Sequence, residues 1–150
     1  YLANQATNWL MGKHIAQPMG TLHPNIAPYG ELFTCKDGKQ IVLAIGSNSQ
    51  FSNLCEVLKC KQVALNDKFN SNQARISNRI ELAQHLELAI AGFDRRTLMT
   101  SLIEKQIPAG AVRNIQEVFE LPEAQKRLVY SAKEGRAMTS IQGNAFCISY

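Results

Sequence analysis

Residues 29–46 read YGELFTCKDGKQIVLAIG and predict an antiparallel β-hairpin. The first arm, Tyr29–Cys35, alternates with a period of two residues, as is typical of a strand with two different faces. Asp37-Gly38 lies between the arms and can supply the positive φ angles of a tight turn. The second arm, Gln40–Gly46, is an apolar run and indicates a strand that is covered on both faces. The hairpin therefore predicts two neighbouring strands of a sheet.

Helices are predicted after the hairpin because apolar residues recur there every three or four positions. Ser47 or Ser49 can cap the first helix, whose apolar face is Phe51, Leu54, Cys55 and Leu58. The segment Lys59–Asn72 is polar and is predicted to be irregular. The longest helix is predicted over Gln73–Ala91, with one apolar stripe formed by Ile76, Ile80, Ala83, Leu86 and Ile90.

The remaining elements are shorter. Asp94 is predicted to cap a helix that ends at Lys105 and is buried by Leu98 and Leu102 with their neighbours Met99 and Ile103. A third strand is predicted within Ile107–Val112, and short helices are predicted after Asn114 and Pro122. Toward the C-terminus, a turn at Glu134-Gly135 separates possible strands at 129–132, 137–141 and 145–150.

These elements predict an α+β fold, a small domain with an antiparallel sheet of about three strands and flanking helices, plus linker segments. We expect a linker helix and loop over residues 1–27, the small domain over residues 28–130 and a return linker over residues 131–150. The segment Lys13–Pro28 is the expected loop, since it contains Pro18, Gly20, Pro24 and Pro28 and has little periodicity.

Composition excludes several classes of protein. The 150 residues are 45% hydrophobic and 19% charged, which is typical of a globular domain and not of a disordered chain. The formal net charge of +4 is small and spread along the chain, so it favours neither nucleic acid nor a membrane surface as a partner. The longest apolar run, Ile41–Ile45, is too short to span a membrane. A cytoplasmic protein is the resulting expectation.

Catalytic and metal-binding patterns are scarce. The spacing of the four cysteines (Cys35, Cys55, Cys60, Cys147) fits no zinc motif, and the three histidines (His14, His23, His85) are scattered, so no metal site is predicted. We interpret Asp37 as a turn residue and His85 as a packed or surface histidine. Arg95 and Arg96 could meet an acidic partner or a phosphate, but a solvated pair at a helix start is the preferred interpretation.

One loop could bind a ligand. Residues 20–29 read GTLHPNIAPY and place an imidazole, an amide and a phenol on a segment that is stiffened by proline. Ligand contacts concentrate on loops that rigid elements hold in place. The alternative is that this segment is only a linker.

Three stretches carry a resemblance to a known family. They are HPNIAPYGELFTCKDGKQIVLAIGSNSQFSNLCEVL, NSNQARISNRIELAQHLE and IPAGAVRNIQEVFELPEAQKR, and they follow one another in this order. They resemble the signatures of the family III CoA-transferases, the CaiB/BaiF group, which includes formyl-CoA transferase and alpha-methylacyl-CoA racemase relatives. The resemblance covers about residues 1–127.

The resemblance implies that this chain is the small domain of an enzyme that transfers coenzyme A between carboxylic acids through an aspartyl intermediate. The catalytic aspartate belongs to a large domain upstream, and no residue here matches its motif, so the resemblance assigns no catalytic residue to this chain. The acyl-CoA and the carboxylic acid are the substrates, no further cofactor is implied, and two subunits form an interlocked homodimer. Gly20, His23, Asn25 and Tyr29 are expected nearest to the acyl-CoA.

Some residues depart from the family pattern. The loop that is glycine-rich in formyl-CoA transferases contains only Gly20 here, and Leu98 and Ala111 replace a usual tryptophan and proline. Asn144-Ala145 likewise replaces a usual Asn-Pro. The glycine-poor loop leaves an acyl-CoA racemase of the same fold open as an alternative, whereas the other departures are interpreted as packing or turn substitutions. A catalytically inactive interaction module is a further alternative of a different class. Because the chain opens on Tyr1 and ends on Tyr150, we expect a fragment that is inactive alone.

Overall fold

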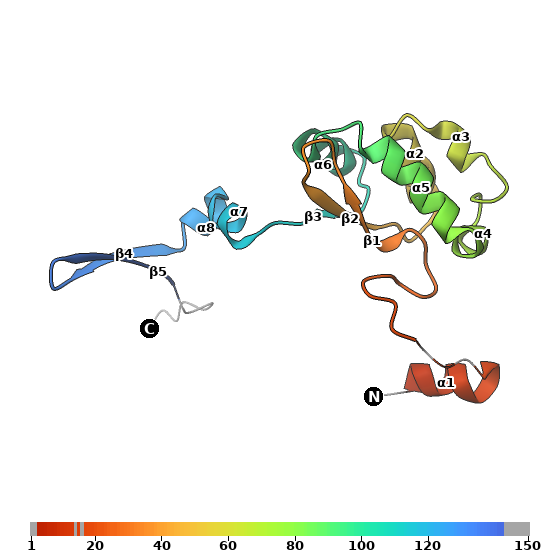
Figure 1. Cartoon of the computed structure of the whole chain (residues 1–150), viewed down its shortest axis with the longest axis horizontal. Coiled ribbons are helices and arrows are strands. Elements are labelled where there is room, and N and C mark those ends of the chain that lie inside the picture. The colour runs from red at the N-terminus through yellow and green to blue at the C-terminus, as the bar shows by residue number, and fades with distance from the viewer. Residues whose placement is uncertain (1–2, 14, 16, 143–150) are drawn as a thin grey trace, which may run out of the picture. The chain divides into compact units, whose positions relative to one another are not determined.

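The computed structural model describes residues 3–13, 15 and 17–142 (Figure 1). The chain divides into two compact units, Tyr1–Val112 and Arg113–Tyr150. The first unit begins with helix α1 (Ala3–Gly12), where a helix was predicted, and continues through turns to the first strand. The lysine that follows this helix, Lys13, places its Nζ 5.5 Å from the centroid of the Trp9 ring.

A three-stranded antiparallel sheet forms the centre of the first unit, which confirms the predicted architecture. It contains β1 (Tyr29–Thr34), β2 (Gln40–Ala44) and β3 (Ala109–Ala111) in the order β1-β2-β3. Gly38 has a φ of +73° in the turn between the first two strands, as the Asp-Gly pair predicted. The expectation that β2 is covered on both faces was wrong, because alternate residues of this strand are only half-buried.

The core lies on one face of this sheet, against the helices α2 (Asn48–Val57), α3 (Lys61–Ala64), α4 (Asn72–Ser77), α5 (Arg79–Ile90) and α6 (Arg95–Glu104) (Figure 1). Ser47 caps α2 through the backbone amide of Gln50, as predicted for one of two serines. The sheet contributes Phe33, Ile41 and Leu43 to the core, and Ile45 directly after β2 adds to it. The helices contribute Phe51, Leu54, Leu82, Leu86, Ile90, Leu98 and Leu102.

The predicted long helix over Gln73–Ala91 is broken. α4 ends before Asn78 and α5 begins after it, and the Asn78 side chain donates to the carbonyl of Ala74 at 2.9 Å and to that of Lys68 at 3.2 Å. The predicted stripe is also wrong at Ile80, which is 80% exposed, whereas Leu82 takes the buried position. The break at Asn78 sets the direction of α5 separately from that of α4.

Three further expectations were wrong. The segment predicted to be irregular contains α3 and the fully buried Phe69, since a single apolar side chain can enter a core without any periodicity around it. Arg95, expected to be solvated, is buried, and its guanidinium donates to the carbonyl of Val112 just after β3. Ile103, expected among the buried neighbours of Leu102, is 68% exposed.

The second unit contains α7 (Ile115–Phe119), α8 (Pro122–Gln125) and the hairpin of β4 (Leu128–Lys133) and β5 (Arg136–Ile141). Asn114 caps α7 and Pro122 opens α8, as predicted, and the predicted turn at Glu134-Gly135 joins the two strands. The possible strand at 145–150 lies outside the described residues. In neither unit does a described helix have the length and apolar character that crossing a membrane requires.

Candidate functional site

The loop 20–29 folds back on itself, so that His23 contacts Tyr29. The His23 amide donates to the Tyr29 carbonyl at 2.9 Å, and the two rings meet edge to face with centroids 5.3 Å apart. The Asn25 amide donates to His23 Nδ1 at 3.1 Å, so a neutral His23 ring carries its proton on Nε2. Three of the four predicted site residues are thus brought together, and Gly20 contributes a turn with φ +64° before them.

Gly30 allows the loop to pass close to β1. Its φ is +86°, and a Cβ at this position would lie 1.9 Å from the carbonyl oxygen of Thr21. Only glycine fits a left-handed backbone in such close contact with another segment. The role of Gly30 is not evident from the sequence, because the close approach depends on the path of the loop.

Polar side chains of α4 form hydrogen bonds with the backbone of the loop. Asn72 Nδ2 donates to the carbonyl of Asn25 at 2.9 Å, and its Oδ1 accepts the amide of Ala27 at 3.2 Å. One turn further along α4, Arg75 Nε donates to the carbonyl of Ala27 at 2.7 Å. The backbone of Asn25 and Ala27 is therefore fixed by side chains that lie more than 40 residues away in the sequence.

Arg75 is fully buried and connects several segments. Its guanidinium also donates to the carbonyl of Phe69 and to Oδ1 of Asn48, both at 3.0 Å, and it lies 4.5 Å from the centroid of the Phe51 ring. Burial lowers the pKa of Arg75 below its usual value. Among the described residues no carboxylate forms an ion pair with this guanidinium, so neutral acceptors and an aromatic face stabilise the charge.

A buried ion pair lies next to the loop. Arg79 Nε is 2.8 Å from Glu31 Oε1, and both side chains are shielded from water, with 13% and 7% of their surfaces exposed. Burial raises the pKa of Glu31 above its usual 4.5, and the nearby Arg79 charge opposes this rise. Within the part of the chain that is described, Glu31 Oε2 has no hydrogen-bond partner.

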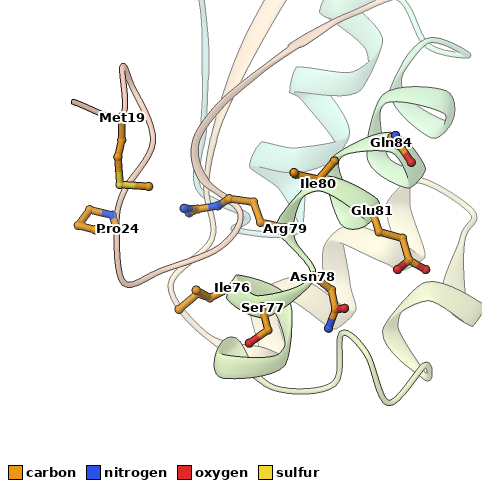
Figure 2. A pocket seen from close by; sticks show the side chains of 9 residues that line it. All are labelled: Met19, Pro24, Ile76, Ser77, Asn78, Arg79, Ile80, Glu81 and Gln84. Atoms are coloured by element: carbon orange, nitrogen blue, oxygen red, sulfur yellow. The ribbon is translucent and has the colours of Figure 1, made fainter. Parts of the chain in front are cut away.

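An open pocket of about 550 Å³ lies between the loop and the corner of α4 and α5 (Figure 2). Pro24 of the loop and Met19 just before it lie opposite Ile76 and Ile80, and the polar lining is Ser77, Asn78, Arg79, Glu81 and Gln84. Both charged groups of this lining are already paired, Arg79 with Glu31 and Glu81 with Lys68. The pocket therefore offers mainly apolar and neutral polar groups.

Asn72, Arg75, Arg79 and Glu31 are the site residues that sequence reasoning missed. The spacing of three residues between Asn72 and Arg75 places both on one face of α4, but Arg79 lies beyond the break at Asn78 and opens α5, so spacing alone does not group it with them. No cluster of three metal-ligating side chains occurs in residues 3–13, 15 and 17–142. Cys35, Cys55 and Cys60 are free and buried, whereas Cys147 lies outside the described residues.

The sequence pattern of CoA-transferase family III matches residues 1–150. A succinate–glutarate CoA-transferase of Agrobacterium fabrum is 32% identical over 142 residues, which are 95% of this chain and 35% of that protein. The human succinyl-CoA:glutarate CoA-transferase is 32% identical over 122 residues, 81% of this chain and 27% of that protein.

The fold has a counterpart among solved structures. A CAIB/BAIF family protein from Brucella suis superposes with a TM-score of 0.78 and 31% identity, over 99% of this chain and 38% of that one. The chain thus spans about a third of the length of the proteins that it matches.

Proposed function

Because this chain belongs to CoA-transferase family III, we propose that it is part of an enzyme that transfers coenzyme A between carboxylic acids. The observation that carries the proposal is the similarity of 95% of the chain to a succinate–glutarate CoA-transferase. That relative and the human one act on dicarboxylic acids by name, so succinyl-CoA and glutarate are the substrates that we propose to test first. The similarity to transferases favours this function over the racemase alternative.

The proposed reaction uses a carboxylate nucleophile of the whole protein, an aspartate that lies outside this chain. Attack of this carboxylate on the thioester carbonyl releases the CoA thiolate and forms a mixed anhydride. The thiolate then attacks the aspartyl carbonyl of the anhydride, which releases the first acid and leaves an aspartyl-CoA thioester. The acceptor acid then attacks the aspartyl-CoA thioester, which releases the CoA thiolate and forms a second mixed anhydride. The thiolate attacks the acceptor's carbonyl in this anhydride, so the new acyl-CoA leaves and the aspartate carboxylate is restored.

Both intermediates react with water, so the reaction needs a cover over the site. We propose that the loop 20–29 supplies this cover, with Gly20, His23, Asn25 and Tyr29 nearest to the acyl-CoA. The contacts that support this role are the hydrogen bonds of His23 to Tyr29 and of Asn72 to Asn25, which hold the loop in one conformation. The same assignment predicts a cytoplasmic protein that forms an interlocked homodimer.

The first test is an assay of the whole protein beside the 150-residue chain. We expect the whole protein to convert succinyl-CoA and glutarate into glutaryl-CoA and succinate, with little loss of thioester to water. The chain alone is expected to transfer no CoA, because it lacks the aspartate. Chromatography of the acyl-CoA products measures the CoA transfer by the whole protein and by the chain alone. Turnover by the chain alone would contradict the assignment of the nucleophile, and a whole protein inactive with every acyl-CoA and acid pair would contradict the function.

A further inference from the structure

We propose that Arg79 is a positioning residue for the reaction, an inference that rests on the CoA-transferase function proposed above. Its Nη2 atom donates to the carbonyl of His23 at 2.7 Å and also to the carbonyl of Ile26. These two carbonyls lie on either side of Asn25 in the chain, so one nitrogen ties down both ends of the segment His23–Ile26. Two of the residues proposed to lie nearest to the acyl-CoA are in this segment.

The ion pair with Glu31 fixes the other side of the guanidinium. Glu31 belongs to β1 and Arg79 opens α5, so the contact at 2.8 Å connects the sheet, the helix and the loop through a single side chain. Arg79 is only 13% exposed, and water competes poorly for contacts that are shielded in this way. The position of the loop is therefore coupled to two rigid elements of the fold.

Arg79 also spans the pocket. Figure 2 shows its side chain extending from α5 toward the segment that carries Met19 and Pro24, while Ile76 and Ile80 lie on the helical side. Loss of the two carbonyl contacts would allow the segment with Met19 and Pro24 to move away from Ile76 and Ile80 on the helices. In the proposed reaction, such a movement would admit water to the anhydride and the thioester.

The variant Arg79→Lys separates the charge from the loop contacts. A lysine side chain ends near the position of the arginine Cζ, so its ammonium can still pair with Glu31 but falls one bond short of the carbonyls of His23 and Ile26. In the whole protein we expect kcat/KM for transfer to fall by about tenfold or more. We also expect a larger share of acyl-CoA to be lost to hydrolysis. The matched control is Arg96→Lys, at an exposed position on α6.

Hydrogen exchange measures the loop without reference to activity. The amides of Leu22 and His23 donate to Met19 and Tyr29, and we expect both to exchange about tenfold faster in Arg79→Lys than in the wild type or the control. If Arg79→Lys is unstable, the double variant Arg79→Gln/Glu31→Gln removes the same loop contacts without leaving a buried carboxylate unpaired.

The outcomes distinguish this inference from the function on which it rests. Faster exchange together with more hydrolysis supports the positioning role. Unchanged exchange, or an unchanged ratio of transfer to hydrolysis in an active protein, overturns that role and leaves the proposed function standing. A wild-type protein that transfers no CoA overturns the proposed function, and the catalytic part of this inference fails with it.

Discussion

Replacement of Arg75 by methionine is expected to lower the free energy of unfolding by about 3 to 5 kcal/mol. The guanidinium is fully buried and donates to the carbonyls of Ala27 and Phe69 and to the side chain of Asn48. Methionine fills a similar volume but donates no hydrogen bond, so the carbonyls of the fully buried Ala27 and Phe69 lose a partner that water does not readily replace. A loss of this size is a large share of the roughly 5 to 15 kcal/mol that stabilises a typical domain.

Removing the charge of Arg75 offsets part of this loss of stability, because a buried cation is costly to desolvate. The compensation is limited here, since the carbonyls of Ala27 and Phe69 belong to fully buried residues and stay in place when the side chain changes. Arg75→Lys is also expected to destabilise the fold, because a single ammonium cannot reach acceptors on three separate segments.

Urea unfolding of the 150-residue chain, followed by far-ultraviolet circular dichroism, measures this difference. Arg96→Met is the matched control, since Arg96 is exposed at the start of α6, and we expect it to change the stability by less than about 0.5 kcal/mol. Equal unfolding midpoints for Arg75→Met and Arg96→Met would show that the buried contacts do not stabilise the fold.

Replacement of Gly30 by alanine is expected to cost about 3 kcal/mol or more. The strained φ of +86° accounts for only part of this effect. The rest comes from the new Cβ, which would lie 1.9 Å from the carbonyl oxygen of Thr21 and 2.9 Å from its carbon. Both atoms belong to the backbone, so the chain must move the loop 20–29 away from β1 to relieve the clash.

Gly38→Ala is the control that separates strain from clash. Gly38 has a similar φ of +73°, but a Cβ there meets nothing within 4 Å, so only the conformational cost of about 1 kcal/mol is expected. Urea unfolding compares the two variants, and hydrogen exchange of Leu22 and His23 reports whether the loop has moved. If Gly30→Ala is as stable as Gly38→Ala and the hydrogen exchange of Leu22 and His23 is unchanged, the close approach of the loop to β1 is refuted.

Much of the fold could be predicted because its signals are local. The hairpin follows from the Asp37-Gly38 turn between two apolar segments, and the starts of α2, α7 and α8 follow from Ser47, Asn114 and Pro122. Each of these signals acts within about four residues of its position, so the chain around it carries enough information.

The predictions were wrong where a residue that is distant in the sequence determines the local structure. The break between α4 and α5 depends on Asn78, whose side chain donates to the carbonyl of Lys68, ten residues before it. Arg95 is buried because a carbonyl at Val112 accepts from it, and the helix start alone does not reveal that partner. A local pattern contains no information on either contact.

The candidate site was predictable in part for the same reason. The prediction of His23, Asn25 and Tyr29 relied on a short, proline-stiffened segment and a family resemblance, and the first two are joined by a local hydrogen bond. The side chains that hold the loop lie on α4, α5 and β1, and their spacing alone did not indicate that they would face the loop.

The most direct test of the central claim, that the loop 20–29 covers an acyl-CoA site, is the ratio of CoA transfer to thioester hydrolysis in the whole protein. We expect the double variant His23→Ala/Asn25→Ala to lower kcat/KM for transfer by about tenfold or more and to raise the share of acyl-CoA that is hydrolysed. An unchanged ratio and unchanged kinetics in a correctly folded variant would contradict the account and leave the loop as a linker.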